Sequence, residues 1–182
     1  MAITRRQFIV VGAVGSLVLA LGGVGVGLSL AFRPSVHREP NTPLVALSPL
    51  GFSILAAVAG ALVDVPDQPD ADEAGVAEGV DALLARLHPA VTAELEQGLR
   101  LLENAAVSAV LEGRFTTFSA SDRATQQAVL LAWSESEYSL FRRVFRALHG
   151  LCMSVYWSQP ERHVACGYAG PPDLSMLMPE AP

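Results

Sequence analysis

The sequence predicts an all-α protein: a bundle of about five helices, with an additional N-terminal signal or anchor helix and an extended C-terminal tail. Two observations support this fold class. In several segments between residues 50 and 157, apolar residues recur three and four positions apart, which is the spacing of one face of an α-helix. No segment alternates apolar and polar residues for long enough to demand a strand, and residues 153–157, with β-branched and aromatic side chains, are the one fragment for which a strand is the alternative.

Residues 1–32 match an export signal of the twin-arginine type. Arg5 and Arg6 are followed by one residue and then Phe8, and no other charge occurs before residue 33. As a helix, residues 9–32 would be roughly 36 Å long, enough to span a bilayer. A simple membrane anchor is the alternative, and the poor cleavage site leaves open whether the leader is removed. The protein is therefore predicted to be periplasmic, or to sit at the periplasmic face of the inner membrane.

Residues 33–49 contain four prolines and little apolar periodicity, so they are predicted to form a linker. A helical domain is predicted over residues 50–182. Its first helix, Leu50–Val63, is an apolar run of 14 residues, too short to span a membrane and typical of a buried core helix.

The acidic segment 64–73 is predicted to be a solvated loop that caps the next helix. Its alternating aspartates suggest a calcium loop, but an EF-hand counted from Asp67 would need glycine where Asp72 stands. The loop reading is therefore preferred.

Two amphipathic helices are predicted next, over Gly75–Leu87 and Ala90–Leu111. In the first, Asp81 belongs to the polar faces, together with Glu78 and Arg86. Gly113 provides a stop for the second. The predicted core residues of the two helices are Val76, Val80, Leu83, Leu84, Leu87, Val91, Leu95, Leu99, Leu102, Ala106 and Val110.

Two further helices complete the predicted bundle. Arg123–Trp133 is preceded by Ser119 and Ser121, either of which can cap it. Ser136–Trp157 is the helix richest in aromatic residues, and Pro160 lies beyond its end. Its predicted core stripe comprises Tyr138, Phe141, Phe145, Leu148, Cys152 and Val155.

Charge and motifs exclude several functions. The net charge is −6, and the part after residue 32 has 10 basic against 18 acidic residues, so nucleic-acid binding is not expected. There is no phosphate-binding loop and no nucleophile motif, and the four histidines are scattered. We therefore expect no catalytic, cofactor or metal site in this chain.

Cys152 and Cys166 are the only cysteines. After export they would share an oxidising compartment. Three states remain open: a disulfide between the two, which would close a loop of about 15 residues and stabilise by roughly 3 kcal/mol, a bridge from one of them to a partner, and buried free thiols.

Four features, in order, carry a family resemblance. They are the Thr4–Phe8 leader, the apolar helix ending at Val63–Pro66, the acidic loop leading into Ala74–Val76, and an aromatic last helix followed by a Gly-Tyr and Gly-Pro-Pro tail. Together they resemble the small subunit (subunit 3, or gamma) of membrane-bound gluconate 2-dehydrogenase and related flavoprotein dehydrogenases. Trp157 departs from the pattern, since a second tyrosine is common there.

The resemblance implies a non-catalytic subunit that binds a large FAD-bearing dehydrogenase subunit and carries it across the membrane on its own twin-arginine signal. A c-type cytochrome would pass electrons onward. Residues implied in partner docking are Tyr156, Trp157, Gly167, Tyr168, Gly170 and Pro171. The apolar, proline-containing tail either lies along that partner or packs on its own helices. The rival hypothesis is a free-standing exported or membrane-tethered scaffold without a dehydrogenase partner.

Overall fold

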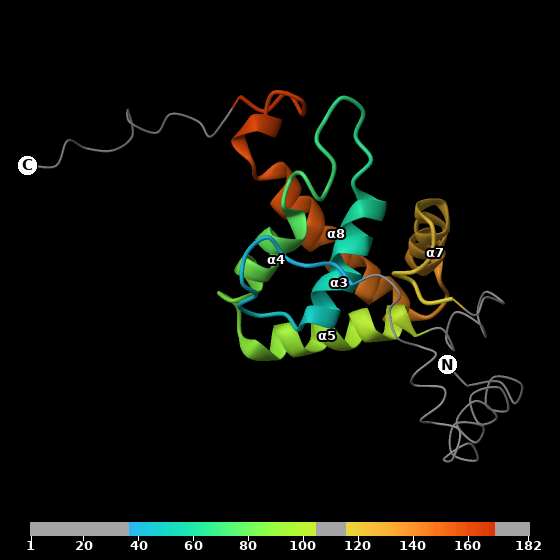
Figure 1. The fold of residues 1–182 in the computed structure, drawn as a ribbon. Helices are drawn as coiled ribbons and strands as arrows, with labels where there is room; N and C mark the ends of the chain where they lie inside the picture. Colours follow the sequence, from blue (N-terminus) through green and yellow to red (C-terminus); the bar gives the residue numbers. More distant parts are fainter. Residues whose placement is uncertain (1–36, 105–115, 170–182) are drawn as a thin grey trace, which may run out of the picture.

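The computed structural model describes residues 37–104 and 116–169. Within these ranges the protein contains five α-helices and no strand (Figure 1), which confirms the all-α prediction. The helices are α3 (Pro49–Leu62), α4 (Val76–Leu84), α5 (Pro89–Glu103), α7 (Arg123–Glu135) and α8 (Ser139–Trp157), followed by a short 3-10 helix, η1 (Pro160–Arg162). The predicted leader helix and the tail from Gly170 onward lie outside the described residues.

Helix α3 is the centre of the bundle, and it contacts α4, α5, α7 and α8 (Figure 1). Ten of its 14 residues are buried, so the apolar run predicted as a core helix is one. Pro49 occupies the first turn, where its missing N–H costs nothing, and the Ser48 hydroxyl accepts a hydrogen bond from the Gly51 N–H at 3.0 Å.

Two carboxylates hold the segment that leads into α3. Asp81 of α4 accepts hydrogen bonds from the backbone N–H groups of residues 45, 46 and 47 at 2.8, 3.0 and 2.7 Å. Glu96 of α5 accepts the next one, from Ser48, at 2.8 Å. Gly51 leaves room for this contact, because a Cβ there would lie 2.4 Å from the Glu96 Oε1. Asp81 is only 3 % exposed, so its prediction as a polar-face residue was wrong.

The described part of the predicted linker is tied to the domain. Arg38 forms an exposed ion pair with Asp72 of the acidic loop at 2.5 Å, and the Asn41 amide donates to Glu78 of α4 at 3.1 Å. Leu47 is buried in the core. The helical domain therefore extends N-terminally of the predicted boundary at residue 50.

The acidic loop closes on itself before α4. The Asp70 carboxylate accepts hydrogen bonds from the N–H groups of Asp72 and Glu73, at 2.9 and 2.8 Å. Gly75 then takes a φ of 59°, which glycine adopts at little cost, and α4 begins at Val76. The loop thus leads into α4, but its side chains do not cap that helix, because Gly75 is the N-cap.

Side chains of α7 satisfy the carbonyl groups at the end of α3. The Arg123 guanidinium donates to the Val63 carbonyl at 2.6 Å, and the Gln127 amide donates to the Ala61 carbonyl at 3.2 Å. The N-cap of α7 is Asp122, whose carboxylate accepts from the Thr125 N–H, rather than Ser119 or Ser121. Ser119 is occupied elsewhere: its N–H and hydroxyl both donate to the buried Glu103 of α5.

Several predicted helix ends were wrong. Helix α4 stops at Leu84, and Leu87, predicted as core, is 41 % exposed in the turn before α5. Helix α5 stops at Glu103 because Asn104 has an extended backbone, not at Leu111. Val91, also predicted as core, is 43 % exposed in α5. The predicted core positions Ala106 and Val110 and the stop at Gly113 lie outside the described residues.

Helix α8 begins at Ser139, and residues 153–157 belong to it rather than to a strand. Its fully buried residues are Leu148, Cys152 and Tyr156, and Phe141, Phe145 and Val155 are partly buried against the core, so the predicted stripe is confirmed except at Tyr138, and Tyr156 joins it. Tyr138, predicted as core, is the N-cap and is 51 % exposed.

Candidate partner-docking surface

The C-terminal end of α8 is fixed by Tyr156. Its side chain is fully buried, and its hydroxyl donates a hydrogen bond to the Pro69 carbonyl of the acidic loop at 3.0 Å. Trp157 is half-buried and meets the Tyr156 ring edge-on, with centroids 5.1 Å apart. Tyr156 has no exposed surface for a partner, whereas Trp157 keeps part of its surface accessible.

Residues 160–169 form a compact turn beyond α8, which we call the C-terminal cap. Gly167 has a φ of +70°, a conformation that explains a glycine at this position. The Tyr168 N–H donates to the His163 carbonyl at 2.9 Å, and the two rings pack edge to face. Val164 and Tyr168 are 88 % and 48 % exposed. The cap therefore presents apolar side chains to solvent, as docking surfaces commonly do.

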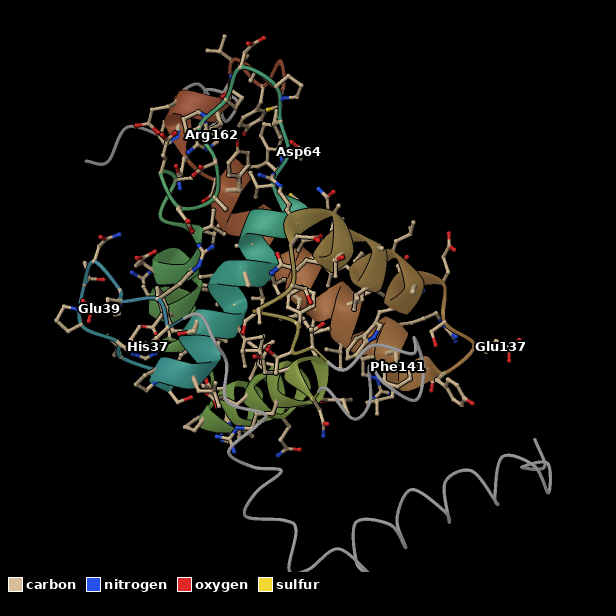
Figure 2. The ribbon with its side chains drawn as sticks, turned by 45° about the vertical axis from the view of Figure 1, so that its right-hand side comes forward. His37, Glu39, Asp64, Glu137, Phe141 and Arg162 are labelled. Atoms are coloured by element: carbon tan, nitrogen blue, oxygen red, sulfur yellow. The ribbon has the colours of Figure 1, made fainter. Side chains whose placement is uncertain are left out.

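Arg162 belongs to the same cap, but its side chain is buried. It is 4 % exposed, and its Cζ atom is 4.3 Å from the centroid of the Tyr156 ring. Figure 2 shows it at the same end of the molecule as Asp64, while Phe141 lies at the other end of α8. Sequence reasoning missed Arg162, because an arginine beyond a helix-ending proline is ordinarily an exposed residue.

A second candidate surface is the groove between α5 and α8. Its volume is about 470 Å³, and its walls are mostly apolar. Val91 and Leu140 are partly exposed along it. The two helices approach closely at Gly98, where a Cβ would lie 3.0 Å from the Val144 Cγ1.

Both cysteines are free thiols in the structure. Cys152 faces the core from α8 and is fully buried, and this burial raises the pKa of its thiol to about 12. Cys166 is exposed in the C-terminal cap, where its thiol lies 3.3 Å from the His163 carbonyl. No disulfide joins the two thiols in the structure, and the three states considered from the sequence stay predictions.

We expect the two thiols to differ sharply in reactivity, because the thiolate is the nucleophile and burial disfavours it in Cys152. At pH 8, an aromatic disulfide reagent should label one thiol of the native full chain rapidly and the second only in denaturant. In Cys166→Ser the rapid phase should disappear. A rapid phase that remained in this variant would contradict the assignment.

The buried carboxylates of the described residues serve the fold. Asp81 and Glu103 accept backbone N–H groups, as does the partly buried Glu96. Residues 37–104 and 116–169 contain no cluster of three or more histidine, cysteine or acidic side chains suited to a metal ion. No helix in the same ranges is both long and apolar enough to cross a membrane.

Five of the residues singled out from the sequence cannot be placed: Arg5, Arg6, Phe8, Gly170 and Pro171 lie outside the described residues. Of the others, the structure brings Tyr156, Trp157, Gly167 and Tyr168 together at one end of α8. Cys152 lies one helical turn before Tyr156. The four predicted docking residues that the structure describes thus belong to one region. Within it Tyr156 is buried, Trp157 is partly buried, and Gly167 and Tyr168 are exposed.

Comparison with known proteins identifies the family. Residues 51–168, more than half of the chain, match the family model of gluconate 2-dehydrogenase subunit 3. Neither the comparison with curated proteins nor that with solved structures gave a match. The matched range runs from the first turn of α3 to Tyr168 of the C-terminal cap, so it covers all of α3 but its first two residues and the whole of every other helix described. The chain therefore belongs to the gluconate 2-dehydrogenase subunit 3 family.

Proposed function

We propose that this protein is the non-catalytic small subunit of a dehydrogenase complex, and that it escorts and stabilises a large FAD-dependent sugar or alcohol dehydrogenase subunit. The observation that carries the proposal is the family match over residues 51–168. The twin-arginine pattern at Arg5 and Arg6 supports export. It also fits the escort role, because this route transports proteins that are already folded, so a bound partner can cross with them.

The proposal divides the work between two chains. The large subunit binds FAD and performs the oxidation, and a c-type cytochrome receives the electrons. The small subunit contributes the signal and a docking surface at the end of α8, where Trp157 and Tyr168 are accessible. Together the two subunits lie in the periplasm, or at the periplasmic face of the inner membrane if the leader is kept.

Export of the large subunit should depend on the arginine pair. We expect the double change Arg5→Lys and Arg6→Lys to reduce the periplasmic amount of a co-expressed large subunit to the background seen without the small subunit. Lysine keeps the charge but loses the pattern that the translocase recognises. The measurement is an immunoblot of the large subunit in periplasmic and cytoplasmic fractions of cells that co-express the two chains.

Arg33→Lys is the matched control, because it makes the same change outside the pattern and should leave export intact. If the double variant left the periplasmic level of the large subunit unchanged, the escort role would be wrong. A free-standing scaffold would show no dependence of any dehydrogenase on this chain.

A further inference from the structure

Arg162 is a buried cation that lacks a counter-ion among the described residues. None of the ion pairs formed within the described residues includes it. Its Nε atom is fully buried and has no hydrogen-bond partner in that part of the chain. Nη1 and Nη2 also form no hydrogen bond with a described residue. Unlike Nε, however, they are not fully buried, so both atoms keep some contact with solvent.

The free-energy cost of burying the Arg162 guanidinium is only partly offset by its contacts with the described residues. Removing a charge from water is costly unless it is paired and hydrogen-bonded. The Tyr156 ring at 4.3 Å supplies a cation–π contact, which offsets part of the cost but offers no hydrogen-bond acceptor. What the arginine lacks is a planar group with two acceptor atoms, and a carboxylate fits its fork of N–H donors.

The neighbouring acidic loop does not provide this carboxylate. Asp64 lies 3.6 Å from the Arg123 guanidinium, and Asp72 pairs with Arg38. Asp70 is occupied by two backbone N–H groups of its own loop. Asp67 and Glu73, the other two acids of the loop, are exposed and form no ion pair with Arg162 within residues 37–104 and 116–169, so a carboxylate for the arginine has to come from outside the described domain.

The surroundings of Arg162 have the character of a protein interface. Val164 and Tyr168, both exposed, belong to the same short turn, and Trp157 is accessible at the end of α8. Arginine and aromatic residues set in an apolar surface are the residues that most often dominate binding energy. Because the stack on Tyr156 already orders the Arg162 side chain, little conformational entropy is lost when a partner binds.

We propose that Arg162 receives a carboxylate side chain of the large dehydrogenase subunit, with Val164 and Tyr168 forming the apolar rim of the contact. The inference rests on the proposed function, because it names the chemistry by which that partner is recognised. In the complex, the carboxylate accepts hydrogen bonds from the guanidinium, and the partner's surface removes the remaining solvent from the pair.

The test compares Arg162→Met with Arg146→Met, an exposed arginine of α8, in the full chain. Methionine keeps the apolar stem and a sulfur contact to Tyr156 while it removes the charge. We expect Arg162→Met to weaken binding of the purified large subunit by at least about thirtyfold, measured by interferometry in detergent. The melting temperature of the isolated chain should stay the same or rise, because an unpaired buried charge is lost. The Arg146 variant should match the wild type in both measurements.

A purely structural arginine would give the opposite pattern, a lower melting temperature with unchanged affinity, and this result would overturn the proposal. If Arg162→Met fails to fold, Arg162→Lys decides, since it keeps the charge but not the planar fork. Weaker binding at an unchanged melting temperature supports the proposal, and unchanged binding contradicts it.

One further variant tests a carboxylate from this chain. Asp173→Asn removes the first acid beyond residue 169. If it weakens binding as much as Arg162→Met, and the double variant is no worse than either, the arginine pairs within its own chain and the proposal is wrong. Failure of the wild-type chain to bind the large subunit would instead overturn the proposed function itself.

Discussion

Replacing Asp81 by alanine should lower the free energy of unfolding by about 4 kcal/mol, one of the largest effects expected for a single change in this protein. The carboxylate accepts three consecutive backbone N–H groups, at residues 45 to 47, and all three lose their partner in the variant. An unsatisfied buried donor costs about 1–3 kcal/mol, and a hydrogen bond to a charged acceptor is stronger than a neutral one.

Removing the Asp81 carboxylate should also affect the structure beyond the three hydrogen bonds themselves. The segment it holds contains the buried Leu47 and leads directly into the N-cap of α3, the helix that all four others contact. Of the two carboxylates that bind this segment, only Glu96 would then remain, accepting the Ser48 N–H. We therefore expect the loss of Asp81 to loosen the start of the central helix, with lower amide protection over residues 45–52.

Urea unfolding of the full chain, followed by circular dichroism at 222 nm, measures the effect. Glu78→Ala is the matched control: it removes an acid from the same helix whose contacts to Asn41 are exposed, and it should cost less than about 1 kcal/mol. Equal losses for the two variants would mean that burial of the Asp81 carboxylate contributes nothing.

Truncating Tyr156 to alanine should cost a similar amount, about 4 kcal/mol, because a large, fully buried aromatic side chain leaves a cavity. Tyr156→Phe should cost only about 1 kcal/mol, since it loses only the hydrogen bond to the Pro69 carbonyl. The alanine variant also removes the ring beneath Arg162, so the C-terminal cap loses its support.

The same urea titration tests Tyr156, with Tyr138→Ala as the control. Tyr138 lies at the start of the same helix and is half exposed, so its truncation should cost about 1 kcal/mol or less. A ranking in which the Phe variant is as unstable as the Ala variant would show that the hydroxyl, and not the ring, anchors the end of α8.

Much of the fold could be predicted because the spacing of apolar residues within each segment already indicates a helix. The apolar run after Pro49 can only be buried, and the spacing of Leu95, Leu99 and Leu102 defines one helical face. Helix ends were harder, because they depend on tertiary contacts. Leu87 continues the apolar pattern of α4, yet the chain leaves the helix at Leu84 and turns toward α5.

The docking region was predicted only in part. The aromatic and glycine signature after α8 pointed to the correct segment, since Gly167 has the positive φ that favours glycine. It did not reveal that Tyr156 is interior while Tyr168 is exposed, because two tyrosines in one segment have the same local chemistry. Nor did it reveal Arg162, which is buried against the Tyr156 ring, six positions earlier in the chain.

By itself, the sequence determined the helical class, the approximate order of the helices, the central apolar helix and the family, since these follow from periodicity and from motifs within single segments. Only the tertiary structure decided what the polar residues do. Asp81 looks like any surface acid of an amphipathic helix, and Arg162 like any arginine beyond a helix end. Asp81 is buried by a segment about 35 positions earlier in the chain, whose backbone N–H groups it binds. Arg162 is buried against the Tyr156 ring at the end of α8. Such contacts depend on packing in three dimensions, and no local pattern encodes them.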